Sequence, residues 1–258
     1  MIEVGNLTYA YRGKTVLKNA SMRVGNGRFY VIFGLHGSGK STLLSLMAGA
    51  RELQSGVVRI NGFDLLKEAV PAKKCLGYCP QEAAYYPSMT VYELLNFVAQ
   101  AKAVREDQRF IRVHELMESY GLEELKDRRI AALGAMELFR LGLAQALVGG
   151  SEILLLDAPT MGLSYADALE ARRMLGELTK KGKTVFLATE SAQEALELAD
   201  EILLLRSGRL SAPVAKEELF ESLDLDALDE TESALYAAAE KTVVPDREDE
   251  TAEKEDEA

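Results

Sequence analysis

The chain has 258 residues, 48% of them hydrophobic and 28% charged, which is typical of a globular protein with one core and, at most, a small appendage. No apolar run approaches the roughly 18 residues that cross a bilayer, so we expect any membrane role to need a partner that spans it. Two cysteines cannot form a disulfide scaffold, and no leader-like segment is recognised, so the sequence predicts a cytosolic protein.

The net charge of −11 is concentrated at one end of the chain. Residues 211–258 hold 17 acidic and 4 basic residues, a net charge of −13, whereas residues 1–210 have a net charge of +2. The body therefore lacks a broad basic surface, and we expect no nucleic-acid partner. The acidic end is interpreted as a solvated extension, with binding to a basic segment of a partner as the less favoured alternative.

Short apolar runs alternate with helical patterns, which predicts an α/β fold with a mostly parallel core sheet. Expected strands cover residues 31–33, 57–60, 76–79, 153–156, 184–188 and 202–205. Expected helices cover residues 40–48, 90–120, 138–148, 166–181 and 192–199. The all-apolar run 153–156 indicates a strand that is covered on both faces.

The pattern divides the chain into three parts. We expect one domain over 1–210, with a helical subdomain inserted at about 82–135, where the alternation stops. Scattered Leu and Ala predict a helical extension over 211–242, and the acidic residues 243–258 are expected to be disordered. Cys75 and Cys79 are assigned to one strand, about 13 Å apart and too far for a disulfide, and are interpreted as small apolar side chains.

The segment Gly34-Leu35-His36-Gly37-Ser38-Gly39-Lys40-Ser41 fits the pattern G-x-x-x-x-G-K-[ST], between an expected strand and an expected helix. Its glycines let backbone N–H groups turn towards phosphate oxygens, and the helix adds its positive end. Lys40 is expected to reach the β- and γ-phosphates, and Ser41 to bind Mg²⁺. An ordinary glycine-rich turn is the alternative. His36 occupies a variable position and is interpreted as an exposed residue.

Asp157 directly follows the buried run 153–156. The carboxyl ends of parallel strands form the edge where ligands bind in open α/β sheets, so this carboxylate can complete a Mg²⁺ shell. The alternative is an Asp that caps a helix. Together with the glycine-rich loop, Asp157 predicts a site for a nucleotide and Mg²⁺.

In this order the segments resemble the ATP-binding subunit of ABC transporters, over residues 1–210. Tyr11 is similar to the aromatic residue that stacks on adenine in that family, and Gln81 matches its glutamine that senses Mg²⁺ and links to the membrane partner. The stretches 86–91, 140–147, 156–160 and 162–163 resemble the start of the helical subdomain, the helix after the signature, the Walker B strand end and the dimer-interface loop. The resemblance implies a P-loop NTPase cassette with an antiparallel β part near the N-terminus.

The resemblance also implies the ligands, ATP and Mg²⁺, and the residues that hold them. The residues expected to contact ATP are Tyr11, Gly34, Leu35, His36, Gly37, Ser38, Gly39, Lys40, Ser41, Thr42, Gln81 and Asp157. Ser41, Gln81 and Asp157 are the expected Mg²⁺ residues.

This chain departs from the family pattern where catalysis is concerned. Where the family has L-S-G-G-Q, residues 133–137 read Leu-Gly-Ala-Met-Glu, without the serine hydroxyl and with side chains where glycines allow close approach. Ser164-Tyr165 replaces the usual Asp-Pro of the interface loop. Ala158 stands at the position of the catalytic glutamate, and a positioned general base is typically worth ~10²–10⁴ in rate.

Glu190 stands at the position of the family's switch histidine. Two like charges about 5 Å apart at an effective dielectric of ~20 repel by about 3 kcal/mol, so a carboxylate beside the γ-phosphate is unfavourable. We therefore expect no intact catalytic residue in this chain. The alternative is that Glu190 acts as a substitute base.

These features predict an ATP-binding transporter subunit on the cytoplasmic face of the cell membrane. We expect it to couple ATP binding at a cassette dimer interface to the movement of a transmembrane permease subunit, and to hydrolyse ATP poorly or not at all. Because both halves of its site are deficient, the resemblance implies a second, different and competent cassette as partner. One alternative is a nucleotide-dependent regulatory or assembly protein that is not engaged in transport. Another, a small-molecule P-loop kinase, leaves Gln81 unexplained and ranks last.

Overall fold

The structure, a computed structural model, describes residues 1–82 and 85–221. Within these residues the centre is a seven-stranded sheet, in the order β10-β9-β3-β8-β7-β6 with β11 also paired to β9. Its parallel strands are β3 (Phe29–Phe33), β6 (Leu76–Cys79), β7 (Ile153–Asp157), β8 (Thr184–Thr189) and β9 (Glu201–Arg206). The short strands β10 (Arg209–Leu210) and β11 (Val214–Ala215) run antiparallel to β9, so the sheet continues beyond residue 210.

A second, antiparallel sheet is built mainly from the N-terminal residues. It has the order β2-β1-β4-β5, with β1 (Ile2–Tyr11), β2 (Lys14–Val24), β4 (Val57–Ile60) and β5 (Phe63–Asp64). Two-residue turns, Arg12-Gly13 and Asn61-Gly62, join its hairpins, and all four residues have positive φ. That conformation matches the twist of paired strands, which is why glycine and asparagine are favoured in such turns.

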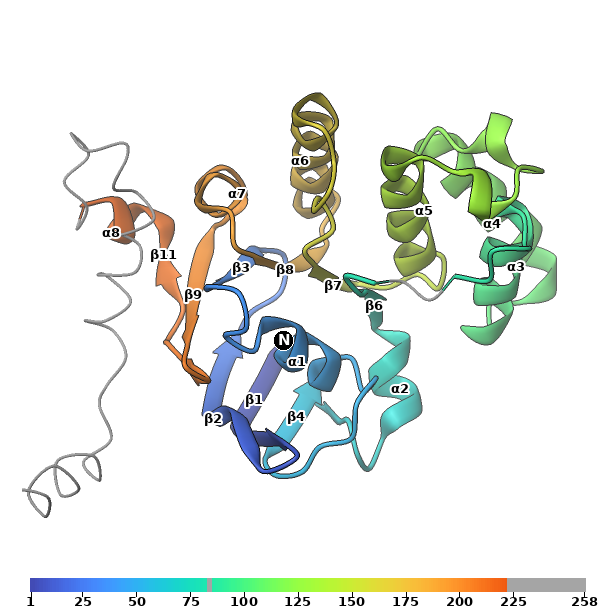
Figure 1. The fold of residues 1–258 in the computed structure, drawn as a ribbon. Coiled ribbons are helices and arrows are strands. Elements are labelled where there is room, and N and C mark those ends of the chain that lie inside the picture. The colour runs from blue at the N-terminus through green and yellow to red at the C-terminus, as the bar shows by residue number, and fades with distance from the viewer. Residues whose placement is uncertain (83–84, 222–258) are drawn as a thin grey trace, which may run out of the picture.

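The helices lie on both faces of the main sheet. They are α1 (Lys40–Met47), α2 (Ala69–Lys74), α3 (Val91–Ala101), α4 (Glu106–Ser119), α5 (Ala135–Leu147), α6 (Tyr165–Lys180), α7 (Ala192–Leu198) and α8 (Lys216–Glu221), with 3₁₀ turns at Glu123–Leu125 and Ile130–Ala132. Figure 1 shows α3, α4 and α5 gathered together, apart from the antiparallel strands β1, β2 and β4.

Alternation along the central strands divides the core into two parts. Phe29, Val31 and Phe33 of β3 pack in the cluster that includes α3 to α7, whereas Tyr30 and Ile32 pack in the cluster with α1 and the antiparallel sheet. Both faces of β3 are buried, as the apolar run predicts. The predicted α/β fold, with its mostly parallel sheet and antiparallel N-terminal part, is confirmed.

Two expectations about local structure are wrong. The single helix expected over 90–120 is two helices, because Ala103 adopts φ +58° and ends α3 before α4 begins at Glu106. Cys75 is not in a strand but caps the end of α2, so only Cys79 lies in β6. The helix expected over 211–242 lies largely outside the described residues, and the disorder expected over 243–258 lies wholly outside them.

Candidate functional site

The glycine-rich loop joins β3 to α1, and its glycines are required by the backbone. Gly37 and Gly39 have φ of +76° and +109°, a region that residues with side chains rarely adopt. At Gly34 the limit is space, because a Cβ would lie 2.3 Å from the Leu205 carbonyl oxygen. The loop is therefore held against the sheet, and α1 begins directly after it at Lys40.

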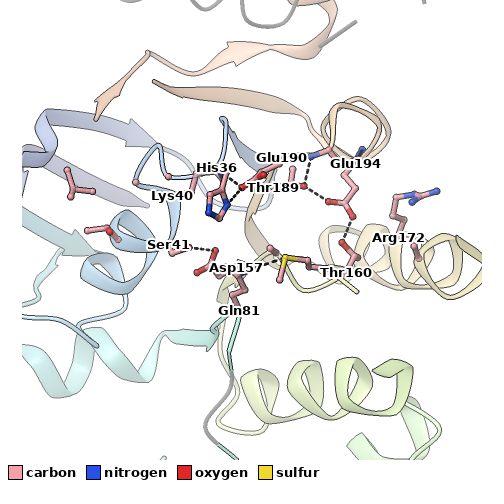
Figure 2. A pocket seen from close by; sticks show the side chains of 18 residues that line it. His36, Lys40, Ser41, Gln81, Asp157, Thr160, Arg172, Thr189, Glu190 and Glu194 are labelled. Carbon is pink, nitrogen blue, oxygen red and sulfur yellow. Dashed lines mark hydrogen bonds and ion pairs between the residues drawn. The ribbon is translucent and has the colours of Figure 1, made fainter. Parts of the chain in front are cut away.

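Lys40 is a buried lysine, 7% exposed, at the centre of the site. Its Nζ donates to the carbonyl oxygens of Gly34 and Leu35 at 2.7 and 2.8 Å, and to Oε1 of Glu190 at 3.3 Å. His36 Nδ1 lies 3.4 Å from the same carboxylate oxygen. Glu190 follows β8 directly, so the end of that strand carries its carboxylate to the loop (Figure 2). The ammonium group is thereby fixed where an anion can reach it.

Ser41 and Asp157 form the second polar contact of the site. Ser41 Oγ donates to Asp157 Oδ1 at 3.0 Å, and Asp157 is the last residue of β7, only 3% exposed. Burial raises the pKa of the Asp157 carboxyl, and the hydrogen bond from Ser41 and the charge of Lys40 oppose that rise. A buried carboxylate beside a hydroxyl offers the oxygen ligands that Mg²⁺ prefers.

These groups line a single cavity of about 510 Å³, drawn in Figure 2. Of the predicted binding residues, the cavity brings together His36, Gly37, Gly39, Lys40, Ser41, Thr42, Gln81 and Asp157. Ala158 and Glu190 also line it. Gly34, Leu35 and Ser38 belong to the same loop but are not lining residues. The Ser38 hydroxyl is buried and, within the described residues, lacks a hydrogen-bond partner.

Tyr11 is placed differently from the other predicted residues, because it does not line the cavity. It is the last residue of β1, where its ring meets Tyr9 edge-on with centroids 5.2 Å apart. The Arg51 guanidinium carbon lies 4.7 Å from the Tyr11 centroid, within the range of a cation–π contact. The Tyr11 ring is thus half-exposed and stacked against a cation.

Gln81 follows β6 and lines the cavity opposite the loop, with its side chain exposed. Its Nε2 donates to the thioether sulfur of Met161 at 3.2 Å. A thioether is a weak acceptor, so the contact costs little to exchange for another partner. The amide is therefore free to turn towards a bound ligand.

Two charged residues of the cavity were not expected from the sequence, Glu194 and Arg172. Glu194 on α7 is 4% exposed and accepts hydrogen bonds from the hydroxyls of Thr160 and Thr189. Arg172 on α6 is 6% exposed, and its Nε donates to Glu197 at 2.6 Å. The pattern Ser191-x-x-Glu194 fits a helix-capping box, a signal that points to the start of α7 but not to the contacts that the Glu194 carboxylate makes.

The positions that differ from the family pattern lie in two places. Ala158 lines the cavity with a methyl group, and its backbone has φ +44°. The segment 133–137 does not line the cavity: Gly134 caps α5, and its N–H donates to the Glu137 carboxylate at 2.7 Å. Ser164 caps α6 by accepting from the Asp167 N–H. Only Ala158 and Glu190 therefore change the cavity of this chain itself.

Comparison with other proteins agrees with this geometry. The family model for ABC transporters matches residues 17–161, which is more than half of the chain. The spermidine/putrescine import ATP-binding protein PotA of Aggregatibacter actinomycetemcomitans is 32% identical over 86% of this chain and 59% of its own length. The linearmycin resistance ATP-binding protein LnrL of Bacillus subtilis is 30% identical over 88% of this chain and 73% of its own length. The chain thus spans about three fifths of the length of the PotA protein.

Two solved structures share the fold. One, described as the structure of the ATP-binding subunit of an ABC transporter, superposes with a TM-score of 0.79 at 25% identity and covers 92% of this chain and 99% of its own. The other is CbiO1 of Clostridium perfringens, described as part of the ABC transporter complex CbiONQ, with a TM-score of 0.74 at 27% identity over 85% of this chain and 90% of its own. Together with the glycine-rich loop and the Ser41–Asp157 pair, these matches place the chain in the ABC transporter family, as one of its ATP-binding cassettes.

Proposed function

We propose that this chain is the subunit of an ABC transporter that binds ATP and Mg²⁺, and that it hydrolyses ATP poorly or not at all. The observation that carries the proposal is a single cavity in which Lys40, Ser41 and Asp157 converge while Ala158 contributes only a methyl group. The first three groups suit binding, and the fourth cannot accept a proton.

The residues present fit a nucleotide with its metal. The buried ammonium of Lys40 and the buried Ser38 hydroxyl, which has no hydrogen-bond partner in the part of the chain that the structure describes, suit phosphate oxygens. Ser41, Asp157 and Gln81 would hold Mg²⁺, which when bound would neutralise part of the phosphate charge. A cation beside Asp157 would also offset the cost of burying that carboxylate.

Impaired hydrolysis follows from the two replaced positions. A water molecule near Ala158 has no acceptor in that side chain to orient it or to take its proton. Glu190 Oε1 already accepts a hydrogen bond from Lys40 Nζ, at 3.3 Å, so this oxygen is engaged by the lysine rather than free to receive a proton from water. The contact therefore favours a role for Glu190 other than that of a substitute base.

The partners are part of the proposal. Among the described residues no helix has the length and apolar character to span a bilayer. The proposed partner is a transmembrane permease subunit on whose cytoplasmic side this cassette docks. A second, competent cassette would supply the signature that residues 133–137 lack. The relative CbiO1 is described as part of a transporter complex, which supports a subunit role for this chain.

The test is nucleotide binding and turnover, measured on the purified chain and on the complex recovered from membranes. We expect ATP–Mg²⁺ to bind, and Lys40→Ala to weaken binding about tenfold or more through loss of charge-assisted hydrogen bonds. Lys180→Ala, which removes an exposed lysine paired with Glu177, is the matched control and is expected to leave binding unchanged. Absence of binding at millimolar ATP, or turnover by the isolated chain at the rate of a competent cassette, would contradict the proposal. Absence of any membrane partner would favour a regulatory role instead.

A further inference from the structure

The Lys40 ammonium has no spare donor among the described contacts. It carries three N–H bonds, and three oxygens accept from it: those of Gly34, Leu35 and the Glu190 side chain. Two of these acceptors are neutral carbonyls of the loop, and Glu190 is the one that carries a negative charge. His36 lies against the same carboxylate oxygen, at 3.4 Å (Figure 2). Glu190 therefore occupies the position of an anion bound to the phosphate loop.

The charges that line the cavity leave little capacity for a further anion. Its acidic side chains are Asp157, Glu190 and Glu194, and its cationic ones are Lys40 and Arg172. Arg172 is paired with Glu197 through Nε, while its buried Nη2 lacks a hydrogen-bond partner among the described residues. A bound Mg²⁺ would offset Asp157, but of the two cationic side chains only Lys40 contacts Glu190, and that contact weakens once Lys40 turns to a phosphate group.

We propose that Glu190 is an internal counter-ion of Lys40 that competes with the terminal phosphate of a nucleoside triphosphate, so that this chain prefers nucleoside diphosphates. The inference rests on the proposed function, because it concerns the same cavity. A diphosphate carries less charge and lacks the terminal group, so Glu190 can keep a contact with Lys40 or His36. A triphosphate brings one more phosphate charge to a lysine that already has an anionic partner.

The size of the effect is limited by solvent. The Glu190 side chain is 50% exposed, so water screens its charge and it can swing away from Lys40. We therefore expect a preference of about tenfold rather than several thousandfold. A preference of that size still has a consequence. The ATP-bound form of this cassette would depend on a partner that keeps the Glu190 carboxylate away from Lys40 or that adds a cation to the cavity.

The experiment measures dissociation constants for ADP and ATP, each with excess Mg²⁺, by calorimetry on the full chain. The wild type is expected to bind ADP about tenfold or more tightly than ATP. Glu190→Gln keeps the size of the side chain and removes its charge, and is expected to bring the two constants within about threefold, mainly by tightening ATP binding. The matched control is Glu177→Gln, since Glu177 is also half-exposed and also paired with a lysine, but lies outside the cavity; it should keep the wild-type ratio.

Three other results would overturn the inference about Glu190. If both nucleotides bind and the ratio is the same in the wild type and in Glu190→Gln, the inference is overturned while nucleotide binding stands. If Glu177→Gln changes the ratio as much as Glu190→Gln does, the effect is one of overall charge and the inference is again overturned. If neither nucleotide binds to any variant that retains its helical circular dichroism, the proposed function fails, and the inference fails with it.

Discussion

At the scale of single residues, Ala158 has a backbone conformation that does not suit a residue with a side chain. Its φ of +44° lies in the left-handed region, which costs a residue with a Cβ roughly 1 kcal/mol or more relative to glycine. We expect Ala158→Gly to raise the melting temperature by about 2–4 °C, measured by thermal unfolding. The control is Ala166→Gly, at an exposed position of α6, which should lower it. A lower melting temperature of the Ala158→Gly variant would contradict the conclusion that the backbone is strained at this position.

Asp157, the proposed Mg²⁺ ligand, is expected at the same scale to lower the stability of the nucleotide-free protein. Because burial raises its pKa, its contribution to the free energy of unfolding is present below the ordinary pKa of an aspartate, about 3.9, and is lost as the pH rises through the raised value. At pH 7 the ionised group is therefore a net cost. Asp157→Asn should raise the melting temperature of the nucleotide-free protein by about 1–4 °C.

The Asp157→Asn variant should also be stabilised less by ATP with Mg²⁺. In the wild type, ATP with Mg²⁺ should raise the melting temperature, because a ligand that binds only the folded state stabilises it. In Asp157→Asn that increment should shrink strongly, since a neutral amide is a poor Mg²⁺ ligand. Asp127→Asn, at an exposed position outside the cavity, is the control for both measurements. An equal increment in all three proteins would remove Asp157 from the metal site.

At the scale of elements, α3 depends on a reciprocal cap. Thr90 Oγ1 accepts from the Glu93 N–H at 3.2 Å, and the Glu93 carboxylate accepts from the Thr90 N–H at 2.9 Å. Thr90→Ala should cost about 1 kcal/mol, a fall of roughly 2–4 °C in melting temperature. Thr179→Ala is the matched control: Thr179 is also half-buried but lies in the last turn of α6, where alanine is the better helix former. Equal losses in the two variants would contradict the cap.

The sequence predicts those structural features whose signals lie in adjacent residues. The loop before Lys40 and the strand ending at Asp157 carry their signals in adjacent residues, and both lie where expected. The break between α3 and α4 falls in residues 102–105, Lys-Ala-Val-Arg, which contain neither glycine nor proline, so no local signal existed. There Lys102 Nζ donates to backbone oxygens of Lys73 and Leu76, a contact that only the tertiary structure creates.

The site divides in the same way. The replacements at positions 158 and 190 are visible in the sequence, but the partner of Glu190 is not, because Lys40 lies 150 residues away. The positions of Tyr11 beside Arg51 and of Glu194 between two threonines are likewise set by packing rather than by spacing. Motifs thus predicted which chemical groups are present, and the fold decided which of them meet.

At the scale of the whole molecule, three large apolar side chains are exposed on segments that contribute residues to the cavity. Leu35, Met161 and Tyr165 are 58%, 64% and 76% exposed, and they belong to the loop, the cavity wall and the first turn of α6. Burial against a partner would remove these side chains from water, which is favourable for apolar surface. Residues 133–137 of the same chain do not line this cavity, which is consistent with the proposal that a second subunit supplies the signature.

We therefore predict that ATP assembles this chain with a competent cassette but not with itself. A second copy would offer Ala135 and Met136, whose side chains keep the backbone away from a phosphate, whereas a partner with a complete signature offers glycines and a serine hydroxyl. Light scattering after gel filtration should find this chain monomeric in the presence of ATP and Mg²⁺. It should find a heterodimer once the partner cassette is added, with the partner's catalytic glutamate replaced by glutamine to prevent hydrolysis. Lys40→Ala should reduce the dimer fraction at a given ATP concentration, because the nucleotide that bridges the two subunits then binds less tightly. An ATP-dependent homodimer of this chain would show instead that its own signature suffices.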